Sequence, residues 1–222
     1  MGIKMNEFNE HGFQVVQLDD EFQFTCSQCG ECCRNVKDAV MVESLDLYNI
    51  AKFFNKNITE IIEQYTVPAM LSRGFAIFLL KTKDHMDICV FLKNGRCSIH
   101  QAKPRVCRLY PLGAWPDDKN NGEFISLIVS KRKFHFNGQR HFVKEWMRNN
   151  LTQADKKFLL AESTLAKQFG KVMNKIDSRD DDNIINLMLI ARYLSFNTEL
   201  DFQEQYLLNN QILLDELKKL MI

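Results

Sequence analysis

Residues 26–34 read CSQCGECCR and place four cysteines within eight residues. The motif is Cys26-x2-Cys29-x2-Cys32-Cys33, where x is any residue. A Cys-x2-Cys turn brings two thiolates within reach of one metal ion, at sulfur–metal distances of about 2.3 Å for zinc. A single buried cysteine is commonly just a core residue, but four cysteines at this spacing are typical of metal chelation. The stretch therefore predicts a metal centre around which this part of the chain folds.

Three more cysteines follow at a distance, and none occurs in the 115 residues after Cys107. In extended backbone, neighbouring side chains point to opposite faces, so the adjacent pair need not share a metal. A four-ligand centre would then use Cys26, Cys29, one of the adjacent pair and one distant cysteine. Such a site closes a long loop and cross-links the fold. The predicted metal ligands are Cys26, Cys29, Cys32, Cys33, Cys89, Cys97 and Cys107.

The ligand count allows one centre or two. One [4Fe-4S] cluster or one zinc ion uses four thiolates and leaves three over. Two tetrahedral zinc sites need about eight ligands, which the seven cysteines and His100 would supply. The x2-x2 run fits an iron–sulfur cluster, and no Cys-x2-Cys recurs in the second group. The sequence therefore favours a [4Fe-4S] cluster, with zinc as the alternative.

Basic residues accompany both cysteine groups. Arg34, Arg105 and Arg108 flank cysteines, and nearby guanidinium groups would lower thiolate pKa values and offset the negative charge of a thiolate site. Ordinary surface arginines are the alternative interpretation. His100 is a possible metal ligand through a ring nitrogen, against the alternative of a solvated or hydrogen-bonded histidine.

The rest of the pattern predicts an α+β, mainly helical protein. Its 222 residues are 45% hydrophobic and 26% charged, as in ordinary globular domains. Residues 1–120 are predicted to form an irregular, metal-centred cysteine region with short strands. Residues 121–222 are predicted to form a strand and a helical extension, packed with the first part as one compact unit. Strands are expected at 22–25, 74–80, 88–92 and 123–136, and helices at 44–55, 59–67, 152–176, 183–194 and 201–222.

Helix starts and faces follow from local signals. Ser44 and Thr59 are predicted N-caps, and Thr152 with Asp155 resembles a capping box. Apolar residues step by three or four from Ala154 to Ile176, which predicts a helix with one core-facing stripe. The alternative for this stripe is a surface for a protein partner, since helical faces often dock other helices.

Composition argues against several partners. The net charge of +1 gives no general attraction to nucleic acid or to an anionic membrane, and the basic residues at 131–141 are expected to form a solvated face. The longest apolar run, Phe75–Leu80, is too short to span a membrane. No apolar signal region follows the first methionine, so we expect a cytoplasmic protein whose cysteines bind metal instead of forming disulfides.

The two cysteine groups carry a longer paired motif. It reads Cys26-x2-Cys29-Gly30-x-Cys32-Cys33-Arg34, then Cys89-x-Phe91-Leu92, Gly95-x-Cys97-x-Ile99-His100 and Lys103-Pro104-x2-Cys107-Arg108-x-Tyr110-Pro111. Over about residues 20–115, this motif resembles the YkgJ-type cysteine cluster family, whose CxxCxxCC domain is thought to chelate zinc or iron. The resemblance implies metal chelation by the cysteines, in a structural or electron-transfer role.

Flagellin lysine N-methylases share a similar cluster. The alternative function is therefore a protein methyltransferase in which the metal centre is a structural part. The sequence has no Gly-x-Gly nucleotide turn and no Cys-x3-Cys-x2-Cys run of radical enzymes that use a methyl donor. A dithiol oxidoreductase using Cys26 and Cys29 is a third possibility, which the following Cys32-Cys33 disfavours.

Overall fold

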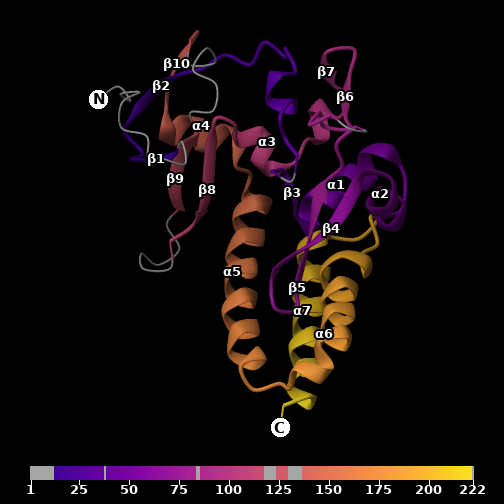
Figure 1. Ribbon diagram of the computed structural model, residues 1–222. Helices are drawn as coiled ribbons and strands as arrows, with labels where there is room; N and C mark the ends of the chain where they lie inside the picture. Colours follow the sequence, from indigo (N-terminus) through magenta and orange to yellow (C-terminus); the bar gives the residue numbers. More distant parts are fainter. Residues whose placement is uncertain (1–12, 38, 84–85, 118–123, 130–136, 222) are drawn as a thin grey trace. The chain divides into compact units, whose positions relative to one another are not determined.

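The computed structural model describes residues 13–221, except 38, 84–85, 118–123 and 130–136 (Figure 1). Helices make up about half of the described residues and strands about a fifth, which confirms the α+β, mainly helical class and the helical C-terminal half. Contacts divide the chain into two compact units, each built from two separate segments. Unit 1 is Met1–Cys29 with Arg105–Leu160, and unit 2 is Gly30–Pro104 with Ala161–Ile222. The expected division at residue 120, and its packing into one unit, remain predictions.

Unit 1 combines small antiparallel sheets with short helices. Its three-stranded sheet has the order β1-β9-β8, and a second sheet pairs β10 with β2. In β8 the side chains of Leu112 and Ala114 are buried, while the intervening positions are more exposed, as the twofold periodicity of a strand requires. The elements are β1 (Phe13–Val16), β2 (Glu21–Gln23), α3 (Arg105–Leu109), β8 (Leu112–Pro116), β9 (Phe124–Val129), β10 (Arg140–Phe142), α4 (Val143–Asn150) and the start of α5 (Gln153–Met173).

Aromatic side chains fix the segment that leads to Cys26. Phe22 and Phe24 are buried and meet Trp146 edge to face, with ring centroids 5.6 and 5.5 Å apart. Phe24 also meets Tyr110 edge to face at 5.6 Å. The Trp146 indole N–H donates to the Leu109 carbonyl at 2.8 Å, at the end of α3. Such aromatic pairs add to the burial energy and orient the chain on both sides of the cluster.

Unit 2 begins with a three-stranded antiparallel sheet and two helices. The sheet order is β3-β5-β4, and central β5 is almost wholly buried, in agreement with its unbroken apolar sequence. The elements up to Pro104 are the 3-10 turn η2 (Glu31–Cys33), β3 (Met41–Val42), α1 (Ser44–Phe54), α2 (Ile58–Tyr65), β4 (Thr66–Ser72), β5 (Phe75–Leu80), β6 (Leu92–Lys93), β7 (Arg96–Cys97) and the 3-10 turn η3 (His100–Ala102).

Both helix caps lie earlier than the sequence suggested. Helix α1 has Glu43 at its N-cap, in a capping box with Asp46, so Ser44 is already the first helical residue. Helix α2 is capped by Asn57, whose side-chain oxygen accepts from the Glu60 N–H at 2.8 Å. The predicted cap Thr59 lies within this helix. In each of these caps, the N-cap side chain accepts from a backbone N–H three residues later, and the acidic side chain there accepts from the N-cap N–H. A lone hydroxyl side chain does not provide this pair of bonds.

The C-terminal helices supply the second half of unit 2. Thr152 and Asp155 form the predicted capping box of α5, and Asp201 caps α7 by accepting from the Glu204 N–H at 3.0 Å. The helix predicted at 183–194 continues as a π-helix in its last turn. The remaining elements are the 3-10 turn η5 (Ser178–Asp180), α6 (Asp181–Leu189), the π-helix η6 (Ile190–Leu194) and α7 (Phe202–Lys219).

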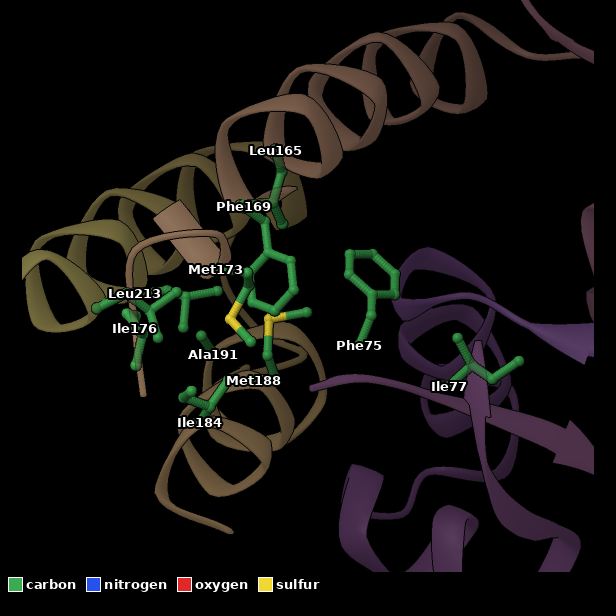
Figure 2. Close-up of a cluster of buried hydrophobic side chains, with 11 residues drawn as sticks. Phe75, Ile77, Leu165, Phe169, Met173, Ile176, Ile184, Met188, Ala191 and Leu213 are labelled. Carbon is green, nitrogen blue, oxygen red and sulfur yellow. The ribbon is translucent and has the colours of Figure 1, made fainter. Parts of the chain in front are cut away.

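The core of unit 2 joins β5 to these helices, and Figure 2 shows its side chains. Leu165 and Phe169 of the predicted stripe on α5 are buried there, and Phe169 meets Phe75 of β5 edge to face at 5.4 Å. Ile184 and Leu213 are also buried in this cluster. This end of the α5 stripe is therefore core. No helix among the described residues combines the length and the hydropathy needed to cross a membrane.

One strand prediction differs from the structure, and another lies only partly within the described residues. The segment 88–92 is not one strand: Ile88 and Cys89 make single bridges to Arg34 and Thr82, and β6 begins only at Leu92. Strand β9 occupies part of 123–136, whose end at 130–136 lies outside the described residues together with most of the basic stretch.

Candidate metal centre

The seven predicted ligands divide between the two units. Unit 2 contains four of them, and unit 1 contains three. None of the seven forms a disulfide. The four-ligand centre expected from the sequence takes its cysteines from both units. The thiol contacts that are described below lie within unit 2. The four cysteines of unit 2 are Cys32, Cys33, Cys89 and Cys97, and the three of unit 1 are Cys26, Cys29 and Cys107.

Backbone hydrogen bonds hold two cysteine segments of unit 2 together. The Cys33 N–H donates to the Gly30 carbonyl at 3.0 Å and closes the turn η2. The Cys89 N–H donates to the Cys33 carbonyl at 2.8 Å, next to an antiparallel bridge between Arg34 and Ile88. Main-chain hydrogen bonds therefore place Cys33 and Cys89 next to each other, independently of any contact between their side chains.

A tight hairpin brings in the fourth cysteine. Strands β6 and β7 pair Leu92 with Cys97, and the two residues between the strands are Asn94 and Gly95. Both have positive φ, 49° and 75°, as the predicted two-residue turn requires. The Ser98 N–H donates to the Phe91 carbonyl at 2.9 Å, beside Cys89. The Asn94-Gly95 turn, which the sequence predicted, therefore reverses the chain and brings Cys97 back toward the other cysteines of unit 2.

Gly30 allows the CxxCxxCC turn to touch this hairpin. Its φ is +73°, and a Cβ added there would lie 2.5 Å from Leu92 Cδ1 and 2.6 Å from the Gly95 carbonyl oxygen. Any side chain at this position would collide with the hairpin backbone. The glycine within the cysteine motif is therefore a packing requirement as well as a conformational one.

The four thiols of unit 2 meet at Cys33. Hydrogen bonds to Cys32, then to Cys89 and Cys97, together with burial, raise the pKa of the Cys33 thiol far above its ordinary value. The bond from Cys33 lowers the pKa of Cys89, and it lowers that of Cys97 to about 6. The protonated Cys33 thus stabilises thiolates around it, and the thiolate is the form of cysteine that binds metal.

Two backbone N–H groups also favour thiolates here. The N–H of Phe91 lowers the pKa of Cys89, and the N–H of Ile99 lowers that of Cys97. Both donors lie two residues after the cysteine, and both side chains are 1% exposed, so burial of an apolar residue fixes the peptide that points at the sulfur. Sequence analysis missed these donors, although the repeated Cys-x-apolar pattern was visible.

The thiols of Cys32, Cys89 and Cys97 each interact with the thiol of Cys33. Among the described residues, no three cysteine, histidine or acidic side chains already stand in the arrangement of a metal site. Metal binding to thiols releases their protons, so S–H···S bonds and metal–sulfur bonds are alternatives for the same sulfurs. The donor set fits a soft or borderline metal: four sulfurs, two of them supported by backbone N–H groups.

One cation that the sequence analysis did not name among the flanking charges acts on one of these thiols. The charge of Lys103 lowers the pKa of Cys97. Arg34 forms an ion pair with Glu31 at 3.3 Å. His100 is exposed on η3, and its pKa is lowered by partial burial and by Lys103. Lys103 is thus a cation that acts on a thiol of this group, and it lies within the quoted motif.

The two remaining arginines hold α3 in unit 1. Arg105 is buried and donates to the Ala114 carbonyl at 3.1 Å. Arg108 pairs with the buried carboxylate of Asp155 at 2.7 Å. Cys107 lies between them and is half-buried. These contacts anchor the helix that carries Cys107.

Comparison with known proteins agrees with the cysteine motifs. Residues 25–130 match the CxxCxxCC family, described as "Putative zinc- or iron-chelating domain". An uncharacterised protein of Methanocaldococcus jannaschii is 31% identical over 90 residues, which is 40% of this chain and 44% of that protein. The chain thus spans less than half the length of this curated relative. No solved structure matches. Neither comparison points to flagellin lysine N-methylases, and residues 25–130, just under half of the chain, are similar to the CxxCxxCC family of putative zinc- or iron-chelating domains.

Proposed function

We propose that the four cysteines of unit 2 bind one metal ion in a four-thiolate site that holds this unit's irregular segments together. The observation that carries the proposal is the contact of the Cys33 thiol with Cys32, Cys89 and Cys97. A tetrahedral zinc ion with bonds of about 2.3 Å places its sulfurs about 3.8 Å apart, close to the separation of hydrogen-bonded thiols. Little movement is then needed to exchange protons for metal.

A mononuclear zinc or iron site fits these contacts better than an iron–sulfur cube. Each thiolate of a cube binds a separate iron, so its four sulfurs stand further apart than thiols in mutual contact. The iron–sulfur cluster remains the second candidate, because the Cys-x2-Cys-x2-Cys run at 26–32 has the spacing that wraps one face of a cube. An electron-transfer role belongs to that candidate, since zinc has no redox chemistry.

The test is metal and sulfide analysis of anaerobically purified protein. We expect zinc or iron without acid-labile sulfide, and Cys89→Ser should lose one metal ion per chain. Ser98→Ala is the matched control, because its exposed side chain adjoins Cys97 without supplying sulfur. Iron with equimolar sulfide and broad visible absorption would support the cluster instead. Full metal content in Cys89→Ser would remove the unit 2 site.

A further inference from the structure

We infer that the outer face of α7 is the contact between two copies of this chain, whose α7 helices pair antiparallel about Gln211. This inference does not depend on the proposed metal site. One face of α7 packs on the core of unit 2, where Tyr206, Leu213 and Leu217 are buried. A helix on the surface of a single globular unit is polar on its opposite face. The opposite face of α7 is instead partly apolar, and this departure needs a partner.

Apolar side chains gather at the middle of this outer face. Leu207, Leu208 and Ile212 are 52%, 61% and 51% exposed. Leu207 and Leu208 lie four and three residues before Gln211, and half-buried Leu214 lies three residues after it. Residues three and four apart are neighbours on a helix surface, so these side chains surround Gln211 as one patch. An apolar patch with a polar border is typical of an interaction surface, unlike apolar residues that are scattered singly.

The charges that border this patch are complementary to themselves. Glu204 and Lys218 are exposed and lie seven residues, about two helical turns, on either side of Gln211, so they share its face. In an antiparallel pair with its twofold axis at Gln211, Glu204 lies beside Lys218 of the second copy. A parallel pair would place like charges together. Lys218 also pairs with Asp215 of its own helix at 2.8 Å, and its three N–H donors allow a second carboxylate.

Gln211 fits the centre of such a pair. Its side-chain nitrogen donates to Asp215 at 3.0 Å, and the amide has a second N–H and a carbonyl acceptor. At a twofold axis, the two Gln211 amides can exchange these bonds, and one polar residue in an apolar helix seam fixes the register. The 18 residues of α7 span about 27 Å, so a contact of one helix from each copy is smaller than a standard interface of about 1,600 Å². The dimer should therefore dissociate on dilution.

The first test is sedimentation of the full chain over a series of concentrations, with a reductant present to prevent disulfides between copies. The wild type should pass from monomer to dimer, and Leu208→Lys should raise the dissociation constant at least about tenfold. Leu71→Lys is the matched control, because Leu71 is 64% exposed on β4 of the same unit. It should dimerise like the wild type. A monomer at every concentration would leave the face to solvent or to a different protein and would overturn the inference, as would equal constants for Leu208→Lys and the wild type.

The second test is a charge swap. Glu204→Lys and Lys218→Glu should each weaken the dimer about fivefold, because each replaces two ion pairs by like charges. The double variant re-forms both pairs with opposite sign and should recover wild-type association. A double variant no better than the single variants would overturn the antiparallel arrangement. If a charge variant does not fold, the wild type decides: moderate salt should weaken its dimer by screening these pairs, and a dissociation constant that does not rise would contradict them. None of these changes removes a cysteine, so the metal content should stay that of the wild type, and failure of this inference leaves the proposed function intact.

Discussion

At the scale of single residues, the CxxCxxCC turn depends on groups other than its sulfurs. Gly30 lets the turn approach the β6–β7 hairpin, and the peptides of Phe91 and Ile99 donate to the sulfurs of Cys89 and Cys97. These groups favour the thiolate forms of Cys89 and Cys97 in the absence of metal. Backbone geometry would thus prepare these cysteines for the proposed metal site.

Two glycines allow a direct test of this packing. Gly30 and Gly95 both have positive φ, but a Cβ at Gly95 meets nothing within 4 Å. Gly95→Ala should therefore cost only the left-handed backbone penalty, about 1 kcal/mol. Gly30→Ala adds the collision with the hairpin and should cost about 3 kcal/mol and weaken metal binding. Denaturant unfolding and metal titration measure both effects, and equal costs for the two variants would contradict the packing role of Gly30.

At the scale of elements, two short helical segments carry cysteines of the motif. The turn η2 carries Cys32 and Cys33, and α3 carries Cys107. Helices this short have little stability of their own, so tertiary contacts must hold them. For α3 these contacts come from Arg105, Arg108 and the Trp146 indole.

The Asp155 carboxylate serves two elements at once. It accepts from the Thr152 N–H at 2.7 Å at the start of α5 and pairs with Arg108 of α3. Asp155→Asn keeps an acceptor for the cap but leaves the partly buried Arg108 without a counter-charge. We expect a loss of about 2 kcal/mol in the free energy of unfolding.

Asp201→Asn is the control for this prediction. Asp201 also caps a helix, but it is exposed, and asparagine is an equally good N-cap. Its change should cost a few tenths of a kcal/mol at most, about the difference between two good caps. Thermal or denaturant unfolding of both variants gives the comparison, and a similar small loss for Asp155→Asn would show that the ion pair contributes little.

At the scale of the whole molecule, the proposed metal site and the apolar core lie in different parts of unit 2. The helical core of unit 2 buries large side chains such as Phe169 and Leu213, and it holds no cysteine. The cysteine segments of the same unit have short strands and turns instead. A cross-link by metal therefore matters most where the hydrophobic core is thinnest.

Withdrawal of metal should show this difference. Free zinc at a thousandfold excess over its dissociation constant would stabilise the native state by about 4 kcal/mol, and a chelator would remove that contribution. Hydrogen exchange should then accelerate at residues 30–34 and 88–99, but much less in α6 and α7. Zinc should restore protection, whereas Mg²⁺, which prefers oxygen ligands, should not. Uniform loss of protection over both regions would indicate that the metal holds the entire unit.

The sequence by itself determined the mainly helical α+β class and many of the local structures, and it carries the cysteine motif on which the match to a putative chelating domain rests. The Asn94-Gly95 turn, the Asp201 cap and the stripe on α5 are visible because turns, caps and helical faces depend on residues near one another in the chain. The CxxCxxCC motif is also local, which is why the similarity to a known family could be read from the sequence.

The tertiary structure alone decided which cysteines share a unit. Cys29 and Cys32 are three positions apart yet belong to different units, while Cys33 contacts Cys89 and Cys97 from distant segments. It also assigned Arg108 to Asp155 and brought Lys103 to act on Cys97. Such groupings depend on long-range pairing between segments, and spacing along the chain does not encode that pairing. The run of four cysteines that is continuous in the sequence is thus divided by the fold between the two units.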